Sequence, residues 1–436
     1  RQTILGENTL SSGYDVANSL RLNSADSARL TRTQTSGDRN KATFSAWVKR
    51  SKLGANQGFF GIHGASSDAG QIEIRFQSSG EGFHISGQAT NWRRTNRAFR
   101  DANGWYHLVV AFDTTQSTAD DRVKIYVNGS QITNFDVRVN PSQNFDTFFN
   151  STQLLTIGRG QAGSAQCYDG YMAEINFVDG FQLTPSSFGF TEFQTGIWKP
   201  KGYFGSYGTN GFRLDFSDNS GTTAVTLGKD RSGQGNDYTP TNLSVSAGAG
   251  NDSFPDTPTN NFCTMNPLVI SPNVTHANGN LDLSGSASDS YSQSNLSTFG
   301  VSSGKWYAEV KVTYSTTNVY VGVCPITTPG NTNLTGSVTD AAVLRMSNTT
   351  FVEGTETGSI FDSISSGDTI GIALDMDNLR VWFSKNGTYA NSGNPATGTN
   401  AIFSGITAGE TMAIAARPLN GTLNFNFGQR PFTYTP

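Results

Sequence analysis

Short runs of alternating apolar and polar residues recur along the chain, separated by turn residues. They include residues 43–48, 71–76, 107–112, 122–127 and 154–157. Alternation with a period of two directs one face of an extended strand toward a core and the other toward water. The pattern therefore predicts antiparallel β-sandwiches, with helix limited to short turns.

Two Asn-Gly pairs mark hairpin turns in the two halves of the chain. Asn128-Gly129 follows the largely apolar residues 123–127, and Asn386-Gly387 follows residues 380–384. Asn-Gly readily adopts the positive φ angles of a two-residue hairpin turn. We therefore expect two separate sandwiches, each with an apolar strand before an Asn-Gly turn.

The region between the two halves has a different composition. Residues 201–260 are dense in Gly, Ser, Thr, Asn and Pro, with a strand-like island at residues 211–216. Pro255 and Pro258 cannot continue a hydrogen-bonded ladder, so we expect an extended connector that is ordered in part. The predicted organisation is an N-terminal attachment segment (1–15), a first sandwich (16–200), a connector (201–265) and a second sandwich (266–436).

Composition supports the all-β fold class. Charged residues make up 15% of the chain, and 48 of the 436 residues are glycine. Helix-rich proteins, by contrast, need Ala, Leu, Glu and Lys on exposed faces. The 30 Lys and Arg and 34 Asp and Glu give a formal net charge of −4 without a charged block, which argues against general nucleic-acid binding. No apolar run approaches the ~20 residues of a membrane span, so no membrane insertion is expected.

The second half carries four motifs in a fixed order. Residues 304–310 (GKWYAEV) and 319–323 (VYVGV) are followed by residues 366–375 with 381–387 (SGDTIGIALD and VWFSKNG), and then by residues 424–432 (NFNFGQRPF). This series resembles the SPRY family, whose patterns are G-K-x-Y-x-E-V, V-x-V-G-V, G-D-x-I-G-x-x-L-D with F-x-x-N-G, and N-F-G-x-x-P-F. The resemblance covers about 130 residues and implies a second β-sandwich.

The first half carries a weaker series, at residues 44–49, 104–109, 123–129, 155–158 and 169–175. In order and spacing these segments resemble a laminin-G or pentraxin-type, concanavalin A-like jelly roll over about residues 16–195. A module of this kind followed by a SPRY-like module resembles phage tail-fibre and related virion-surface proteins.

Acidic residues in the first half do not match a glycosidase pattern. Laminarinase-type glucanases on this fold carry Glu-x-Asp-x-x-Glu along one strand, because an acid and a nucleophile must flank the same bond. Residues 71–75 offer only Glu73, while Glu174 and Asp179 are five residues apart and fall on opposite faces of a regular strand. We therefore expect a structural role for Glu174 and no enzymatic activity.

Histidines and cysteines give no zinc pattern. No His-x-His or His-x-x-x-His pair and no Cys-x-x-Cys pair occurs. His107 follows Trp105-Tyr106 in a strand motif, and we expect it to be a hydrogen-bonded structural imidazole. No cofactor is expected. Structural calcium occurs in many laminin-G-like domains, so it is left open, with Asp169 and Asp179 as candidate ligands.

One local cluster of charge suggests glycan binding. Residues 91–101 contain Trp92, Arg94 and Arg97. An indole stacks on sugar faces, and guanidinium groups grip carboxylates or sulfates, so the three side chains are candidates for binding an acidic glycan. The alternative is an ordinary strand with arginines on its wet face.

Loops supply the candidates in the second half, because SPRY-like domains usually bind through loops at one end. Residues 313–318 and 346–351 contain Tyr314, Asn318 and Asn348, which are our candidate binding residues. The alternative for both loops is a simple solvated turn.

These resemblances imply a non-enzymatic virion-surface protein, a tail fibre or spike, that binds carbohydrate on a bacterial host. Two alternatives remain: a structural capsid or tail decoration that binds only virion proteins, and a depolymerase with an active site between subunits. Weak glycan contacts benefit from several linked sites, so we expect a homotrimer. Attachment to other virion proteins is expected through residues 1–15, and the localisation is the virion surface.

Overall fold

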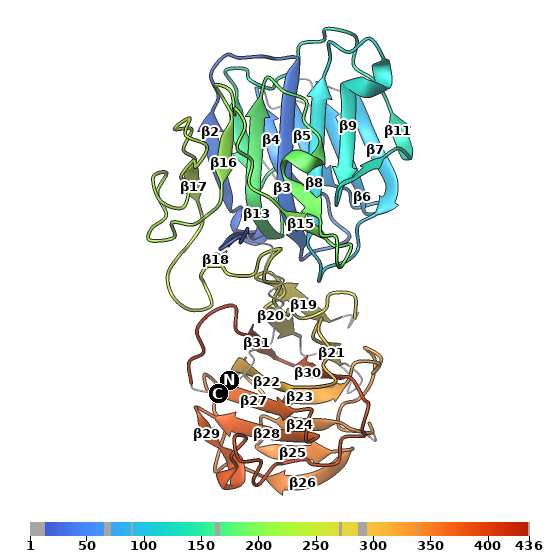
Figure 1. Cartoon of the computed structure of the whole chain (residues 1–436). Helices are drawn as coiled ribbons and strands as arrows, with labels where there is room; N and C mark the ends of the chain where they lie inside the picture. The colour runs from blue at the N-terminus through green and yellow to red at the C-terminus, as the bar shows by residue number, and fades with distance from the viewer. Residues whose placement is uncertain are drawn as a thin grey trace. The chain divides into compact units, whose positions relative to one another are not determined.

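The computed structural model describes residues 14–64, 71–88, 90–161, 166–269, 273–286, 294–336 and 338–434. The chain divides into two compact units, and the boundary falls between Asn261 and Phe262. Each unit is built from antiparallel sheets (Figure 1), which confirms the predicted all-β fold class. Among the described residues, no helix is long and apolar enough to cross a membrane. The predicted attachment segment lies outside the described residues apart from Tyr14 and Asp15.

One sheet of the first sandwich, here called the β3 sheet, has the order β10-β9-β8-β3-β13-β1-β18, with β16 also paired to β13. Its strands are β1 (Ser19–Leu22), β3 (Lys41–Arg50), β8 (Tyr106–Asp113), β9 (Val123–Val127), β10 (Ser130–Ile132), β13 (Gly170–Asp179), β16 (Phe212–Leu214) and β18 (Ser253–Phe254).

The other sheet, here called the β5 sheet, has the order β11-β7-β6-β5-β4-β12-β2-β17. Its strands are β2 (Arg29–Thr33), β4 (Gln57–His63), β5 (Gln71–Phe76), β6 (Gly82–Gly87), β7 (Thr90–Ala98), β11 (Phe135–Arg138), β12 (Leu154–Ile157) and β17 (Thr239–Thr241). A separate two-stranded sheet pairs β14 (Gly189–Thr191) with β15 (Trp198–Pro200).

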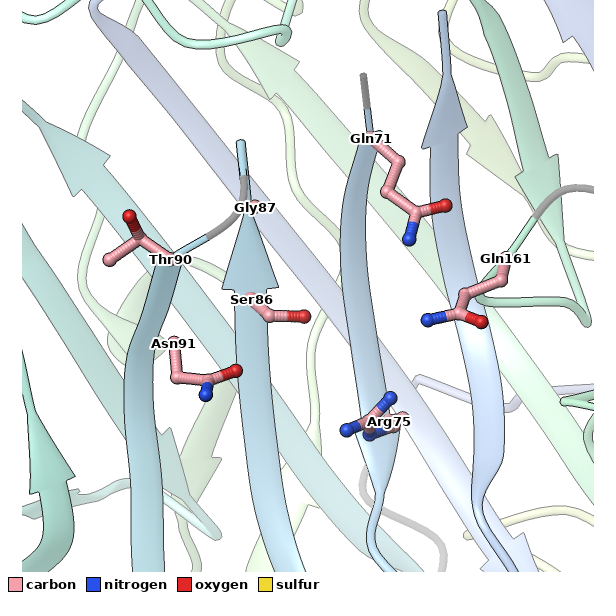
Figure 2. Close-up of a pocket in the computed structure, with 7 residues that line it drawn as sticks. All are labelled: Gln71, Arg75, Ser86, Gly87, Thr90, Asn91 and Gln161. Atoms are coloured by element: carbon pink, nitrogen blue, oxygen red, sulfur yellow. The ribbon is translucent and has the colours of Figure 1, made fainter. Parts of the chain in front are cut away.

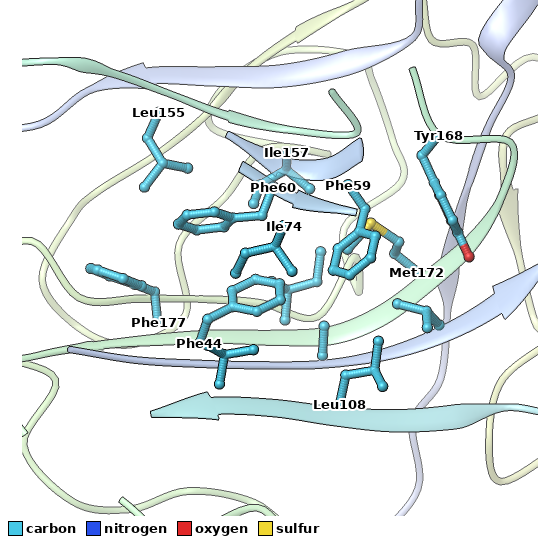
Figure 3. Packing of buried hydrophobic residues seen from close by; sticks show 14 of the residues in the cluster. Phe44, Phe59, Phe60, Ile74, Leu108, Leu155, Ile157, Tyr168, Met172 and Phe177 are labelled. Atoms are coloured by element: carbon cyan, nitrogen blue, oxygen red, sulfur yellow. The ribbon is translucent and has the colours of Figure 1, made fainter. Parts of the chain in front are cut away.

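The core of the first sandwich is rich in aromatic side chains (Figure 3). Phe44 of β3 lies 4.7 Å from Phe60 of β4 between ring centroids, and Phe60 stacks on Phe177 of β13 at 6.0 Å. Strand β5 contributes Ile72 and Ile74, both fully buried. Since successive side chains of a strand point to opposite faces, the polar residues of β5 must lie on the outer face of the sheet.

The predicted connector is built into the first unit. Strand β16 pairs with β13, β17 with β2, and β18 with β1. Of these three strands, β17 contains a proline, Pro240. It is tolerated there because β17 lies at the edge of its sheet. The unit boundary at residue 261 falls inside the region where we expected the two sandwiches to separate.

The second unit also contains two sheets. The β22 sheet has the order β19-β20-β31-β22-β27-β28-β29, and the β23 sheet has the order β21-β30-β23-β24-β25-β26. The strands are β19 (Val274–Ala277), β20 (Asp282–Gly285), β21 (Asn295–Leu296), β22 (Lys305–Tyr314), β23 (Val319–Pro325), β24 (Ala342–Arg345), β25 (Thr349–Val352), β26 (Thr355–Ser359), β27 (Thr369–Asp375), β28 (Arg380–Lys385), β29 (Thr388–Tyr389), β30 (Met412–Pro418) and β31 (Gly421–Asn426).

Helix among the described residues is limited to 3₁₀ turns, as predicted. These are η1 (Ser24–Asp26), η3 (Ala119–Arg122), η4 (Pro185–Ser187) and η5 (Ala390–Ser392).

The end of the described chain packs on strand β22. The buried carboxylate of Glu309 accepts hydrogen bonds from the backbone N–H groups of Thr433 (2.8 Å) and Tyr434 (2.7 Å). Phe432 meets Tyr307 edge to face, with centroids 4.9 Å apart. The GKWYAEV and NFNFGQRPF motifs, which are far apart in sequence, therefore contact each other in the folded domain.

Candidate functional site

A polar hollow of about 150 Å³ lies on the outer face of the β5 sheet (Figure 2). The residues that line it come from three neighbouring strands and one loop, and their side chains carry amide, hydroxyl and guanidinium groups. They are Gln71, Arg75, Ser86, Gly87, Thr90, Asn91 and Gln161. Such groups form hydrogen bonds with the hydroxyl, amide or carboxylate groups of a small polar ligand.

Glycine shapes the floor of this hollow. A Cβ atom on Gly87 would lie 2.8 Å from Cη2 of Trp92 and 3.0 Å from Cγ1 of Ile72. Both side chains belong to the apolar core beneath the sheet. The absent side chain of Gly87 would point inward, so glycine here lets the core pack directly beneath the backbone that forms the floor.

Backbone of a neighbouring loop lies against the sheet beside the hollow. We call residues 158–161 and 166–168 the covering segment. The N–H of Gly58 donates to the carbonyl oxygen of Gln166 at 3.1 Å. A Cβ on Gly58 would lie 2.3 Å from Cα of Gly160, and one on Gly61 would lie 2.4 Å from the Gly160 carbonyl oxygen. The covering segment thus rests on β4 without an intervening gap.

An ion pair ties the covering segment to β5. Arg75 donates from Nη1 to Oε2 of Glu73 (2.6 Å) and to Oε1 of Gln166 (2.9 Å), and Gln161 donates to Oε2 of Glu73 (3.4 Å). The Glu73 side chain is fully buried and that of Arg75 is 13% exposed. Arg75 thus lines the hollow with its charge balanced by Glu73, which lies beneath the covering segment.

Two buried histidines share this face of the sheet. The Nε2 atom of His84 lies 3.1 Å from Oδ1 of Asn91. Burial together with the nearby Arg75 lowers the pKa of His84 to about 4. Burial together with Arg159 lowers the pKa of His63 to about 4. Both imidazoles are therefore neutral at pH 7 and add no charge to the hollow.

Trp92 does not lie where the sequence predicted. Asn91 pairs with Ser86 and Arg93 pairs with Ile85, so Trp92 is an extra residue in a β-bulge. Its indole is 2% exposed and meets Phe112 edge to face in the core. This burial contradicts the hypothesis that Trp92 offers a stacking face to a sugar.

Arg94 and Arg97 lie on the same strand but do not line the hollow. Arg94 pairs loosely with Asp136, with 3.7 Å between Nε and Oδ2. The guanidinium of Arg97, an exposed residue, lies 5.2 Å from the ring centroid of Phe99. The structure therefore separates the three residues that we grouped as one glycan-binding candidate.

The two loops predicted as binding sites in the second sandwich do lie near one another, and each candidate holds a neighbouring segment. Tyr314 donates from its hydroxyl to the carbonyl oxygen of Ile364 at 2.6 Å. Asn318 accepts from Arg345. The side chain of Asn348 is buried and bonds both backbone groups of Phe361. These contacts give all three residues structural partners.

The candidate calcium ligands do not share a site. Asp169 precedes β13 and Asp179 ends it, so about 30 Å of strand separates them. Asp169 accepts from Oγ of Ser24 at 2.8 Å, and Asp179 accepts from the N–H of Asn210 at 3.0 Å. Burial raises the pKa of both carboxyls. Across the described part of the chain, no group of three or more His, Cys, Asp or Glu side chains is suited to a metal ion.

Glu174 has the structural role that its sequence position suggested. Its carboxylate accepts from Nε of Arg213 (2.6 Å) and from the hydroxyl of Tyr14 (2.8 Å), on the outer face of the β3 sheet. His107, fully buried, accepts at Nδ1 from the Trp198 indole (2.9 Å) and contacts Oγ of Ser45 (2.9 Å) through Nε2. Burial lowers the pKa of His107 to about 3.

Sequence reasoning missed every residue that lines the hollow. The available signal was the outward position of Gln71 and Arg75, which alternate with the apolar residues of β5. Gln161 is about ninety positions away, in a turn, and only the fold brings it to the same place.

Comparison with known families now assigns both sandwiches. A family model for the concanavalin A-like lectin/glucanases superfamily, of laminin G type, matches residues 22–186, and the SPRY domain model matches residues 305–430. The chain carries a concanavalin A-like laminin G domain followed by a SPRY domain. The polar hollow belongs to the laminin G domain.

Solved structures similar to the chain fall into the same two groups. A putative carbohydrate-binding protein from Bacteroides ovatus is 15% identical, with 52% of this chain and 59% of that chain covered and a TM-score of 0.37. A pentraxin from Limulus polyphemus is 15% identical (39% and 80% covered, TM-score 0.30). A human SPRY domain is 16% identical (36% and 98% covered, TM-score 0.28). No curated protein matches the sequence.

Proposed function

We propose that the protein is a non-catalytic carbohydrate-binding protein and that the laminin G domain binds sugar in the hollow on its β5 sheet. The observation that carries this proposal is the hollow itself, an open polar site on the outer face of a lectin-like sandwich. Amide side chains such as Gln71, Asn91 and Gln161 both donate and accept hydrogen bonds. They are therefore suited to the hydroxyl groups of a sugar.

The arrangement of charge supports binding over hydrolysis. Glycoside hydrolysis usually requires two carboxyl groups on either side of the scissile bond, about 5–9.5 Å apart. The described residues that line the hollow include no Asp or Glu, and the nearby Glu73 is buried and paired with Arg75. With Arg75 balanced by Glu73, the neutral amide and hydroxyl groups of the hollow favour the hydroxyl groups of a sugar.

We further propose that this binding serves attachment of a phage virion to its bacterial host. The support is the resemblance of the domain order, laminin G type followed by SPRY, to tail-fibre and other virion-surface proteins. The protein would act as a homotrimer on the virion surface, held to other virion proteins through residues 1–15. Mass spectrometry of purified particles tests the location, and light scattering of the isolated chain tests the trimer.

A glycan array tests the binding function. The full chain is applied to glycans attached through their reducing ends, beside the double variant Gln71→Ala/Asn91→Ala. We expect the double variant to lose at least tenfold in signal, because two of the amide groups of the hollow are removed. The control is Gln194→Ala, an exposed glutamine of the β14–β15 loop. Equal signals from the double variant and the control contradict the proposed site, and no signal from any protein contradicts the function.

A further inference from the structure

The outer face of the β5 sheet is open over only part of its width. On one side, the covering segment lies on β4 and makes backbone contact with Gly58 and Gly61. The covering segment also contacts Glu73 and Arg75 of β5, and the hollow lies beside it among residues of β5, β6 and β7 (Figure 2). A sugar chain that crosses the strands would meet the covering segment immediately beyond Arg75.

The covering segment is fixed rather than loosely placed. Its backbone forms a small ladder, in which the N–H of Gly160 donates to Gln166 at 3.2 Å and the N–H of Tyr168 donates to Gly158 at 2.9 Å. Isolated bridges join Cys167 to Gly58 and Arg159. With the side-chain contacts to Glu73 and Arg75, these bonds hold it against both β4 and β5.

The size of the hollow agrees with this limit. Its volume is about 150 Å³, whereas sites that enclose drug-sized ligands measure about 300–1,000 Å³. The floor cannot deepen, because the Trp92 and Ile72 side chains lie directly beneath Gly87. The part of a glycan that enters the hollow is therefore small, about one sugar ring.

We propose that the hollow binds the terminal residue of a glycan, and that the covering segment excludes the interior of a longer chain. This inference rests on the proposed carbohydrate-binding function and specifies which part of the carbohydrate is bound. The specificity would lie in the terminal ring and its substituents, since that ring alone reaches Gln71, Arg75 and Asn91.

Ladders of defined oligosaccharides test the inference on the full chain. The probes are galacturonate, mannose, glucose (α-1,4) and N-acetylglucosamine (β-1,4) chains of one to eight units, measured by calorimetry, together with any glycan that binds on the array. For a probe that binds, we expect the affinity to change by less than about threefold between the dimer and the octamer. A rise of tenfold or more with chain length overturns the inference while leaving the binding function intact.

A single variant adds a second readout. Asn91 is exposed, so Asn91→Ala should fold, and we expect it to weaken the binding of the shortest and longest chains by the same factor, about 3- to 10-fold for one lost hydrogen bond. Weakening of the long chains alone means that the hollow holds an internal residue, which contradicts the inference. Absence of binding by every ladder and every array glycan contradicts the proposed function, and the inference fails with it.

Discussion

The two outer faces of the laminin G domain differ in what covers them. The outer face of the β3 sheet lies under the protein's own chain: Trp198 bonds His107, Asp256 bonds Lys49, and Arg213 bonds Glu174. The outer face of the β5 sheet is covered by a short segment over β4 and is open at the hollow.

Polar side chains have different tasks on the two faces. Strands β3 and β13 are buried along almost their whole length, and their outward polar residues bond other parts of the same unit: Thr43 bonds Phe181, and Lys49 bonds Asp256. In strand β7, by contrast, Asn91 and residues 96–98 are exposed, while Trp92, Arg93 and Thr95 are buried. The same alternating pattern in the sequence thus produces an internal attachment surface on one sheet and a surface available to a ligand on the other.

The largest effect is expected at the ion pair of Lys49 and Asp256. Both side chains are 1% exposed, with 2.9 Å between Nζ and Oδ2. Lys49→Met leaves a buried carboxylate without its cation, and we expect a loss of about 3–5 kcal/mol in the free energy of unfolding, measured by denaturant titration. The double variant Lys49→Met/Asp256→Leu should recover much of this loss.

The control is the surface pair of Lys124 and Asp121, with 3.1 Å between charged atoms and much greater exposure. Lys124→Met should change the free energy of unfolding by less than about 1 kcal/mol. Equal losses in the free energy of unfolding for Lys49→Met and Lys124→Met would show that burial on the covered face does not make its ion pair more important for stability.

A second covered contact tests the contrast in the SPRY domain. Glu309→Gln replaces the carboxylate that accepts from Thr433 and Tyr434. Hydrogen bonds to charged groups contribute about 1.5–3 kcal/mol, so we expect a loss of about 1–3 kcal/mol in the free energy of unfolding. Hydrogen exchange at the backbone amides of residues 432–434 should accelerate. Unchanged exchange there would mean that the carboxylate does not hold this segment.

A third prediction concerns the pH dependence of stability at the buried His63 of strand β4. The pKa of His63 is about 4 in the folded domain against 6.5 for the free side chain, so protonation favours the unfolded state. The contribution of the neutral His63 to the free energy of unfolding is fully present above pH 6.5. It falls by about 1.4 kcal/mol per pH unit as the pH is lowered to 4. The stability of wild type relative to His63→Gln should therefore fall by about 2 kcal/mol between pH 7 and pH 5. A difference independent of pH contradicts this prediction.

The smallest effect on stability is expected at the rim of the hollow. Ser86→Ala and Thr90→Ala alter residues that line the hollow and are not buried, and such substitutions usually change stability by less than about 0.5 kcal/mol. Thermal unfolding should therefore be nearly unchanged while glycan binding weakens. A large loss of stability in either variant would place these residues with the covered face instead.

The sequence predicts the strands and turns well, because their signals are local. Asn128 and Asn386 have φ angles of 47° and 48°, as the Asn-Gly hairpins require. Trp92 was placed on the wrong face because one bulge residue reverses the alternation in β7. Alternation alone cannot show where such a residue is inserted.

The connector and the hollow depend on contacts between distant residues. Strands β16, β17 and β18 have two or three residues each, too few to display a period. The hollow combines three strands with Gln161, and its shape depends on the covering segment as much as on side chains. Local signals exist only for parts of them, namely the strand-like residues 211–216 and the outward Gln71 and Arg75, and these signals do not show which distant residues the parts contact.

A single substitution at one of the glycines under the covering segment could change the length of the proposed binding site. Gly58 and Gly61 touch no ligand in the proposed site, yet any side chain there would collide with the backbone of Gly160 or Arg159. Such a collision would lift the covering segment away from β4 and lengthen the open face. A protein that binds the ends of glycan chains could in this way become one that binds their internal residues, without alteration of any residue that contacts sugar.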